Sequence, residues 1–412
     1  MGQGRLVDDN RSLPSWLKTG GSIQKADHNA WRPLVASLTN DKDVEKFKKQ
    51  LADKPIFQVI DNYDEQIAEL FVSRNPQLYQ SSYEVKKASL VPLLKEHYGT
   101  TQPWKKGRWV YYPWSGRLIH TIEEALFWEA RTIRNRDLMT MDEQQKFRDF
   151  RAGFAGMSVG SNAAIATVLE SGSEYMKIAD NAVISGSNLN RIISGISEIG
   201  EQKSTAVARR LYEMNPYITI EKLDDNIDQA SIEAFFTEPW PLEVVIDEID
   251  DLKIKILLRV EAKKRRIPVI MVTDLGDDVM LDVERYDLDP NLPLFHGLAG
   301  DIETLLDREV SRREWLKYAT QIINTKNVPL IMQKSLLKIG RSLVTQPQLG
   351  GTAMTAGAVI AFAIRQLALG GELKSGRTIA SFEKIFLNNP WPRSGIEHRA
   401  HTKKVKRILG SL

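Results

Sequence analysis

A spaced set of charged and amide side chains occupies residues 180–203. It comprises the carboxylate Asp180, the amide Asn188 and the cations Arg191 and Lys203. Arg and Lys neutralise the charge on phosphate oxygens, which an anionic carboxylate needs before it can attack phosphorus. The set therefore suits a site that holds ATP while a carboxylate attacks its α-phosphate. The alternative is that the two cations are ordinary surface charges.

A turn of small residues precedes this set, at Gly156-Met157-Ser158-Val159-Gly160-Ser161, and we predict a helix after it at 162–170. Small residues let a strand-to-helix turn approach a phosphate, and the helix N-terminus supplies free N–H groups. The middle and last glycines of G-x-G-x-x-G are replaced by Ser158 and Ser161, so a tight packing turn is an equal alternative. In the ligand-binding reading, the nucleotide contacts Gly156, Ser158, Gly160 and Ser161.

Asp180 ends a second predicted strand, about twenty residues after the turn. An acid at this distance accepts a ribose hydroxyl in dinucleotide-binding folds. The competing interpretation is that Asp180 caps its own loop.

A third predicted strand, at 243–247, ends in further carboxylates. Asp247, Asp250 and Asp251 lie at its carboxyl end, where parallel sheets bind ligands. We select Asp250 as the ligand of a divalent cation, because hard cations prefer carboxylate oxygens. Asp251 precedes a predicted helix at 252–265 and is better explained as its N-cap.

Strands and helices alternate from about residue 151 to 275, which predicts an α/β fold with a Rossmann-like parallel sheet and helices on both faces. Before it, helical patterns at 43–53, 64–73 and 83–98 and an aromatic strand or hairpin at 107–120 indicate a mainly helical N-terminal module. An α+β extension follows. The predicted boundaries are 1–125, 126–300 and 301–412, the last ending in a basic tail at 403–407.

The same residues resemble the ThiF/MoeB superfamily, which includes ubiquitin-activating enzymes. The family pattern is an acid, eight residues to Ser-Asn-Leu-x-Arg, a dozen to Lys and a dozen to Asn-Pro. Here the intervals are eight from Asp180 to Asn188, twelve from Arg191 to Lys203 and twelve from Lys203 to Asn215. The resemblance covers about 131–300 and extends more weakly to 390. Motifs such as Tyr112-Pro113-Trp114 resemble a poorly characterised bacterial subgroup.

The resemblance implies roles for individual residues. Asp180 would bind ribose, while Asn188, Arg191 and Lys203 would contact the triphosphate, and Asp250 would hold Mg²⁺. In many relatives an upstream arginine enters the site of the other subunit of a homodimer. Arg134 and Arg136 are the two candidates for that role, and either could equally be a surface charge.

Composition limits the chemistry further. The chain has 412 residues and no cysteine, so it can provide neither a thioester-forming thiolate nor a Cys-x-x-Cys zinc site. An adenylate formed here would be captured by a separate thiol, amine or sulfide donor, or within the substrate. The formal net charge of +3 is too small to argue for nucleic acid, with tRNA as the one exception that relatives suggest.

The apolar stretch at 353–370 carries Arg365 and Gln366 and is short for a bilayer, so we interpret it as a buried helix, with a dimer interface as one use. The chain start lacks a signal-peptide pattern, and we expect a cytoplasmic protein without membrane partners. His296 is either a rim residue with a catalytic role or a partner of a backbone carbonyl. His398 and His401 are a weak metal-site candidate.

The function predicted from these observations is ATP- and Mg²⁺-dependent adenylation of a carboxylate. The carboxylate would belong to a small ubiquitin-like protein, a peptide, a small molecule or a modified nucleoside. Two alternatives stay open: an NAD- or FAD-binding oxidoreductase, and a binding scaffold of the same fold without catalysis.

Overall fold

A computed structural model describes residues 27, 29–225, 227–336, 338–387, 398–404 and 407. The sequence of residues 1–40 predicts an irregular segment, of which residues 1–26 lie outside the described residues, as does part of the basic tail at 403–407. The chain divides into two compact units, described separately below. Unit 1 comprises Met1–Met141 and Tyr212–Tyr217, and unit 2 comprises Asp142–Leu211 and Ile218–Leu412. The domain boundaries at 125 and 300 stay a prediction.

Unit 1 is built on a four-stranded sheet with the order β1-β3-β4-β2. Its strands are β1 (Leu34–Ala36), β2 (Gln58–Asp61), β3 (Arg108–Tyr112) and β4 (Arg117–Thr121). Its helices are α1 (Asp41–Leu51), α2 (Tyr63–Arg74), α3 (Tyr83–Tyr98) and α4 (Glu124–Thr132). The antiparallel pair β3–β4 confirms the hairpin predicted at 107–120. Strands β1 and β2, which give the helical module its sheet, were not predicted.

The aromatic residues of this hairpin form part of the core. Trp109 and Tyr111 are fully buried, and the buried His120 ring is stacked between Trp109 at 4.6 Å and Tyr63 at 4.8 Å. The later segment 212–217 completes the unit. The Tyr112 hydroxyl donates to the Tyr212 carbonyl at 3.0 Å, and Trp114 Nε1 donates to Glu213 Oε1 at 2.9 Å.

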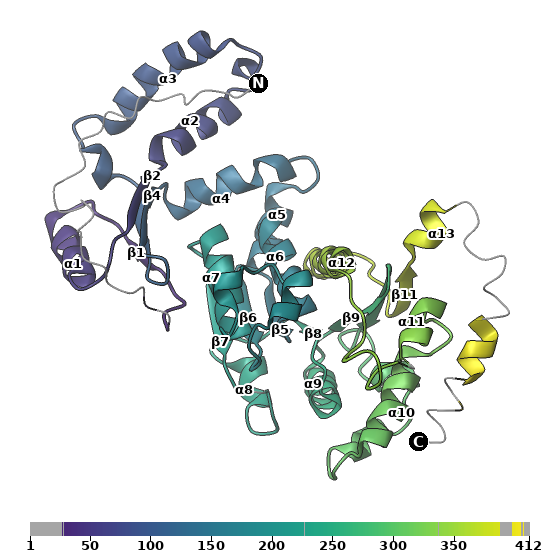
Figure 1. Ribbon diagram of the computed structural model, residues 1–412. Helices are drawn as coiled ribbons and strands as arrows, with labels where there is room; N and C mark the ends of the chain where they lie inside the picture. The colour runs from purple at the N-terminus through teal and green to yellow at the C-terminus, as the bar shows by residue number, and fades with distance from the viewer. Residues whose placement is uncertain are drawn as a thin grey trace. The chain divides into compact units, whose positions relative to one another are not determined.

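Unit 2 contains a seven-stranded sheet with the order β11-β10-β9-β8-β5-β6-β7 (Figure 1). Its strands are β5 (Arg151–Ala155), β6 (Tyr175–Ala179), β7 (Thr219–Leu223), β8 (Val244–Asp247), β9 (Val269–Leu275), β10 (Asp278–Glu284) and β11 (Gly376–Ala380). Strands β9, β8, β5, β6 and β7 run parallel, as predicted. Strands β10 and β11 are antiparallel additions at one edge.

Helices cover both faces of this sheet. They are α5 (Met141–Asp149), α6 (Val159–Leu169), α7 (Lys203–Met214), α8 (Ile232–Thr237), α9 (Leu252–Arg265), α10 (Arg312–Ile323), α11 (Leu330–Leu336), α12 (Gly350–Ala368) and α13 (Phe382–Phe386). Helices α6 and α12 pack together on one face, and α8 and α9 lie on the other. The fold class predicted from the sequence is therefore confirmed.

The loop around His296, which follows β10, does not lie at the rim of the site. His296, in the loop at 287–300, was predicted either to lie at the rim of the site with a catalytic role or to bond a backbone carbonyl. Instead the buried side chains of Leu294 and Phe295 join the core formed by α8 and α9, followed by Ile302 and Leu305. His296 lies 4.0 Å from Asp282, in the middle of β10, rather than at the carboxyl edge of the sheet.

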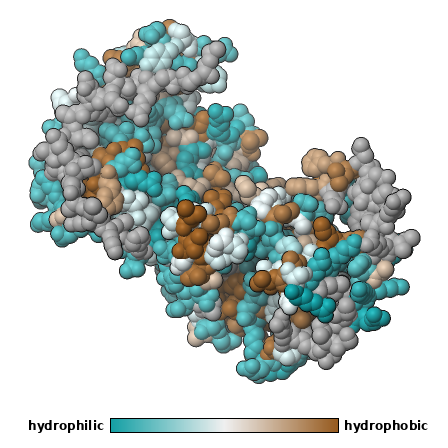
Figure 2. All heavy atoms as spheres, viewed as in Figure 1, coloured by the Kyte–Doolittle hydropathy of each residue, from teal (hydrophilic) through white to brown (hydrophobic). Residues whose placement is uncertain are grey.

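One face of helix α12 is buried, which confirms the buried helix predicted at 353–370 for that face. Among the described residues it is the one helix long and apolar enough to cross a membrane, but Ala353, Ala356, Ile360 and Ile364 are buried within unit 2. A Cβ added to Gly357 would lie 2.6 Å from the backbone of Asn162 in α6. This close approach is typical of a packed internal helix. The surface drawn in Figure 2 is mostly hydrophilic, with hydrophobic residues gathered in a few places.

Candidate active site

The predicted small-residue turn joins β5 to α6 at the carboxyl edge of the sheet. Gly156 has a φ of +93°, and a Cβ at this position would lie 2.4 Å from the Glu248 carbonyl oxygen. Both observations require glycine. Because Glu248 directly follows β8, the close approach also brings the residues after β8 against the turn.

Helix α6 begins at this turn without a side-chain cap. Ser158 is the N-cap residue, yet its hydroxyl accepts no N–H group of the first turn. Ser161 directs its own hydroxyl to the Ser158 carbonyl at 2.7 Å. Among the residues that the structure describes, no side chain accepts from the first-turn N–H groups, which include those of Gly160 and Ser161. Such a helix N-terminus favours an anion.

Asp180 follows β6, the neighbour of β5, and its carboxylate touches the turn. Its Oδ2 accepts a hydrogen bond from the Met157 N–H at 2.7 Å, and its Oδ1 accepts one from the Ala182 N–H at 2.8 Å. The side chain thus organises its own loop, as in the capping interpretation, and also lies beside the turn, as the ribose-binding interpretation requires. Lone pairs of both oxygens are left for hydroxyl donors.

Arg191 reaches the turn from the loop between β6 and α7. Its Nε donates to Ser158 Oγ at 3.1 Å, and one terminal nitrogen donates to Asn190 Oδ1 at 2.9 Å and to the Ser187 carbonyl at 3.2 Å. The guanidinium therefore lies over the start of α6. A second terminal nitrogen has no hydrogen bond within the described chain and is free to bind phosphate.

Lys203 is the first residue of α7, and the loop before it folds back toward Asp180. The Lys203 N–H donates to the Ala182 carbonyl at 2.9 Å, and Lys203 Nζ lies 3.9 Å from Asp180 Oδ2. Only 14% of its side chain is exposed. Asn188 is buried, with its Oδ1 accepting from the Ser185 N–H at 3.0 Å, which leaves its Nδ2 group for a ligand.

The carboxylates after β8 have three different surroundings. Asp247 is fully buried and binds Lys255 and Arg259. Burial alone would raise its pKa, but the two cations hold the pKa below its usual value. Asp251 caps α9 through the N–H groups of Lys253 and Ile254, which confirms the predicted cap. Asp250 is exposed, and its carboxylate has no partner among the described residues.

Asp250 is thus the carboxylate in this segment that is available to a metal ion. It lies one residue beyond Ile249, whose backbone nitrogen is 2.9 Å from the position of a Cβ on Gly156. Within the described chain no group of three or more His, Cys, Asp or Glu side chains could hold a metal ion. One carboxylate together with phosphate oxygens and water fits Mg²⁺, which seldom has an all-protein shell.

Two further carboxyl groups lie on the α6 side of the sheet and escaped the sequence analysis. Glu248 Oε1 accepts from the Val272 N–H at 2.8 Å, and burial raises the pKa of Glu248 well above its usual value. Asp274, near the end of β9, accepts from Gln348 Nε2 at 3.3 Å. Burial raises its pKa to about 6, against the opposing influence of Gln348 and Arg191.

The remaining candidates lie elsewhere. Arg134 and Arg136 belong to unit 1 and are exposed, and Arg136 lies 3.6 Å from Glu129. Their role stays a prediction. His398 Nε2 donates to the Val328 carbonyl at 2.9 Å and lies 3.1 Å from Gln333 Nε2. Neither His398 nor His401 belongs to a metal-binding group within the described residues.

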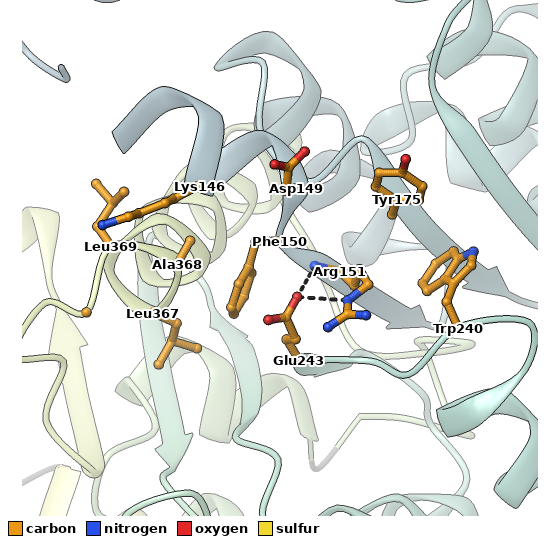
Figure 3. Close-up of a pocket in the computed structure, with 11 residues that line it drawn as sticks. Lys146, Asp149, Phe150, Arg151, Tyr175, Trp240, Glu243, Leu367, Ala368 and Leu369 are labelled. Atoms are coloured by element: carbon orange, nitrogen blue, oxygen red, sulfur yellow. Dashed lines mark hydrogen bonds and ion pairs between the residues drawn. The ribbon is translucent and has the colours of Figure 1, made fainter. Parts of the chain in front are cut away.

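A cavity of about 920 Å³ opens at the other edge of the same sheet (Figure 3). It lies at the first residues of β5 and β6, Arg151 and Tyr175, and at the end of α12. Arg151 binds Glu243 at 3.0 Å, and Tyr175 lies beside Trp240. Its cations are balanced by Asp149 and Glu243, and none of the predicted site residues lines it.

Part of the chain matches a known protein family. The model of the ThiF family matches residues 130–279. These residues are a ThiF-family domain. The matched segment contains the glycine turn, Asp180, Arg191, Lys203 and Asp250, so each predicted nucleotide contact lies inside the ThiF-family domain.

Individual relatives match this domain and its surroundings. "Uncharacterized protein MT1398" of Mycobacterium tuberculosis (strain CDC 1551 / Oshkosh) is 34% identical over 270 residues, which are 66% of this chain and 37% of that protein. The chain thus spans little more than a third of this relative. The tRNA threonylcarbamoyladenosine dehydratase of Bacillus subtilis (strain 168) is 28% identical over 182 residues, covering 44% of this chain and 68% of the relative.

Solved structures with a similar arrangement include two proteins from E. coli. The tRNA N6-threonylcarbamoyladenosine dehydratase TcdA is 19% identical, with a TM-score of 0.42, covering 60% of this chain and 97% of that one. MccB, solved with AMPCPP and MccA, is 12% identical, with a TM-score of 0.42, covering 74% and 79%. TcdA has also been solved with ATP.

Proposed function

We propose that the ThiF-family domain adenylates a carboxylate with ATP and Mg²⁺. The observation that carries the proposal is the meeting of separate segments at the glycine turn. Asp180 Oδ2 lies 2.7 Å from the Met157 nitrogen and 3.9 Å from Lys203 Nζ, and Arg191 Nε lies 3.1 Å from Ser158 Oγ. Two cations and an uncapped helix N-terminus therefore surround one small volume next to a carboxylate.

Each side chain would have a defined task. Asp180 would accept a ribose hydroxyl, and the first turn of α6 would hold phosphate through its N–H groups. Arg191, Lys203 and the Asn188 amide would bind the triphosphate oxygens. The two cations would neutralise charge that grows on the phosphates as the reaction proceeds, which is the dominant contribution that such a site makes.

The reaction balances without a proton transfer. One oxygen of the incoming carboxylate forms a bond to the α-phosphorus, and the bond from that phosphorus to the bridging oxygen of the β-phosphate breaks. Pyrophosphate leaves with the electron pair, and the acyl-adenylate stays in the site. Asp250 would hold Mg²⁺, which when bound neutralises phosphate charge and orients the α- and β-phosphates.

The acceptor of the acyl group would be external. With no cysteine in the chain, a thiol or amine of a partner, a sulfide donor, or a group within the substrate itself would capture the adenylate. The substrate classes in the proposal are the terminal carboxylate of a small protein or peptide, a small acid, and a modified nucleoside in tRNA. The similarity to the tRNA threonylcarbamoyladenosine dehydratase of Bacillus subtilis supports the tRNA option. A homodimer completed by Arg134 or Arg136 belongs to the same proposal.

Calorimetric titration of the full chain with ATP in the presence of Mg²⁺ tests the proposal. We expect binding, and at least a ten-fold loss of affinity in Arg191→Ala and in Lys203→Ala, because each removes a charge-assisted contact worth about 1.5–3 kcal/mol. Folded protein that binds NAD but not ATP would overturn the proposal in favour of the oxidoreductase alternative. Binding of neither would favour the scaffold.

A further inference from the structure

We infer that Gln348 positions Arg191 for phosphate binding, through Asn190, and so makes the segment before α12 part of the nucleotide site. The inference rests on the proposed function, because it assigns Arg191 to the triphosphate. It concerns residues 158 positions apart in the sequence, a separation that spacing motifs do not address.

The first step of the argument is the way Arg191 is oriented. Of its hydrogen-bond partners, Asn190 Oδ1 is the nearest, at 2.9 Å. An adjacent residue is a poor anchor by itself, because both side chains sit on the same exposed loop. Ser158 at the start of α6 holds the Nε side of the guanidinium, whereas the terminal nitrogen depends on Asn190, which itself needs a fixed point outside the loop.

Gln348 supplies this fixed point. Its backbone carbonyl accepts a hydrogen bond from Asn190 Nδ2 at 2.9 Å. The Asn190 amide therefore uses its nitrogen to hold Gln348 and its oxygen to hold Arg191. An amide with both ends engaged has one orientation available, so the acceptor presented to Arg191 is fixed in space.

Gln348 is held in turn by the sheet. Its Nε2 donates to Asp274 Oδ2 at 3.3 Å, near the end of β9. The hydrogen bonds thus run without interruption from β9 through Gln348, Asn190 and Arg191 to Ser158 at the start of α6. Both ends of this chain lie on the rigid sheet-and-helix framework, while its middle is the loop that carries the cation.

Backbone packing restricts the same segment. A Cβ on Gly350 would lie 2.3 Å from the Asn190 carbonyl oxygen, so the first residue of α12 lies directly against the backbone of the loop. Asn162 Nδ2 donates to the Arg191 carbonyl at 2.9 Å from the α6 side. The peptide units of Asn190 and Arg191 are therefore held between α12 and α6, which limits how far the Arg191 side chain can swing.

The test compares Gln348→Ala and Asn190→Ala with Gln346→Ala, all in the full chain. Gln346 is exposed, lies two residues from Gln348 and has no partner among the described residues. Two readouts are needed. Phenylglyoxal labelling of Arg191, mapped by mass spectrometry, reports how firmly the guanidinium is held without any nucleotide. Calorimetric titration with Mg²⁺ and ATP reports the consequence for binding.

We expect Asn190→Ala, which removes the hydrogen bond to Arg191, to label several-fold faster at Arg191 and to bind ATP about ten-fold more weakly. Gln348→Ala keeps the backbone carbonyl that accepts from Asn190 but removes the side-chain bond that ties it to Asp274, so both readouts should change in the same direction and by no more than in Asn190→Ala. Gln346→Ala should match the wild type in both readouts. If Gln348→Ala unfolds, Gln348→Met keeps the side-chain length, removes the donor and takes its place. Unchanged labelling and affinity in folded Gln348 variants would overturn the inference.

The two proposals fail in different ways. If wild-type protein does not bind ATP, the proposed function fails, and faster labelling of Arg191 in the Gln348 variants still supports the positioning role. If the wild type binds ATP while the Gln348 variants label and bind as it does, the proposed function stands and the positioning role fails.

Discussion

Asp250 and Asp251 are adjacent carboxylates with different surroundings. Asp251 caps α9, whereas Asp250 is exposed and has no partner among the described residues. We predict that Asp250→Ala removes the Mg²⁺ dependence of ATP binding and leaves the free energy of unfolding unchanged. Asp251→Ala should cost about 1 kcal/mol of stability through the lost cap and keep the Mg²⁺ dependence. Calorimetry and urea denaturation of both variants measure the contrast, and a reversed pattern would reject the assignment.

Asp274 predicts a pH-dependent stability. Burial raises the pKa of this carboxyl group from 3.8 to about 6, with Gln348 and the nearby Arg191 opposing the shift. The folded state therefore binds the proton more tightly than the unfolded state. The stabilisation by that proton is complete below pH 3.8 and is lost as the pH rises through 6.

Asp274→Asn should consequently raise the free energy of unfolding at pH 7.5, by about 1–3 kcal/mol for a shift of this size. The gain should shrink as the pH falls toward 4. Urea denaturation at a series of pH values measures this. Burial also raises the pKa of Glu248 in the same region, and Glu248 is unchanged in the variant, so the Asn substitution isolates the part due to Asp274. A pH-independent difference between the two proteins would contradict the prediction.

At the scale of single residues, the sequence predicted those candidate site residues that lie close together in the chain. Asp180, Arg191 and Lys203 lie within 24 residues of one another and meet at the glycine turn as expected from the sequence. Asp251 was correctly predicted as a cap, because a cap depends on its next three residues. Glu248, Asp274 and Gln348 were missed. Their positions near the site depend on pairing of β8 with β9 and on docking of α12, which no local pattern encodes.

Helices α6 and α12 meet at a glycine, and this contact gives a prediction at the scale of elements. A Cβ on Gly357 would lie 2.6 Å from the Asn162 backbone, whereas a Cβ on Gly351 in the same helix would meet nothing within 4 Å. Replacing a helical glycine by alanine ordinarily stabilises by up to about 1 kcal/mol. We expect that gain from Gly351→Ala and a loss of about 1–3 kcal/mol from Gly357→Ala, caused by overpacking.

Chemical denaturation of the two glycine variants provides the measurement. Equal effects would show that α12 is not packed against α6 as described. Gly357→Ala should also weaken the proposed ATP binding, because α6 follows the turn proposed to bind phosphate and carries the Asn162 amide that holds Arg191. Gly351→Ala is the matched control for that readout.

The parallel strands were predictable because each ends before a helix with a clear apolar pattern. Strands β10 and β11 were not. Strand β10 follows β9 after only Gly276 and Asp277, so the two form a hairpin where an alternating fold leads one to expect a crossover helix. Its partner β11 lies about ninety residues later in the sequence, and a pairing that distant leaves no periodic signal in either segment.

At the scale of the whole molecule, the proposed homodimer can be tested by mixing variants. Lys203→Ala damages a site from within, whereas a double Arg134→Ala, Arg136→Ala variant would damage only the site of the other subunit. Each variant alone should bind ATP weakly. Random mixing should restore about a quarter of the sites, since half the dimers are mixed and each has one intact site. Titration of the equilibrated mixture measures the recovered stoichiometry.

Sedimentation of the wild-type chain provides the control, because a mass near 46.7 kDa would mean a monomer. In that case no recovery is expected, and the arginines of unit 1 would have no role in trans. If binding stoichiometry recovered although the protein is monomeric, the recovery could not come from mixed dimers, and the proposed role of the arginines would be rejected.

Unit 1 consists of two segments that are far apart in the sequence, and this affects how the protein folds during its synthesis. Its hairpin is completed by Tyr212 and Glu213, which the ribosome adds 100 and 99 residues after Tyr112 and Trp114, respectively. While the intervening β5, β6 and α7 are emerging, the nascent N-terminal unit still lacks its last segment. Its final closure must therefore wait until unit 2 is partly synthesised, so the two units complete their folding together rather than one after the other.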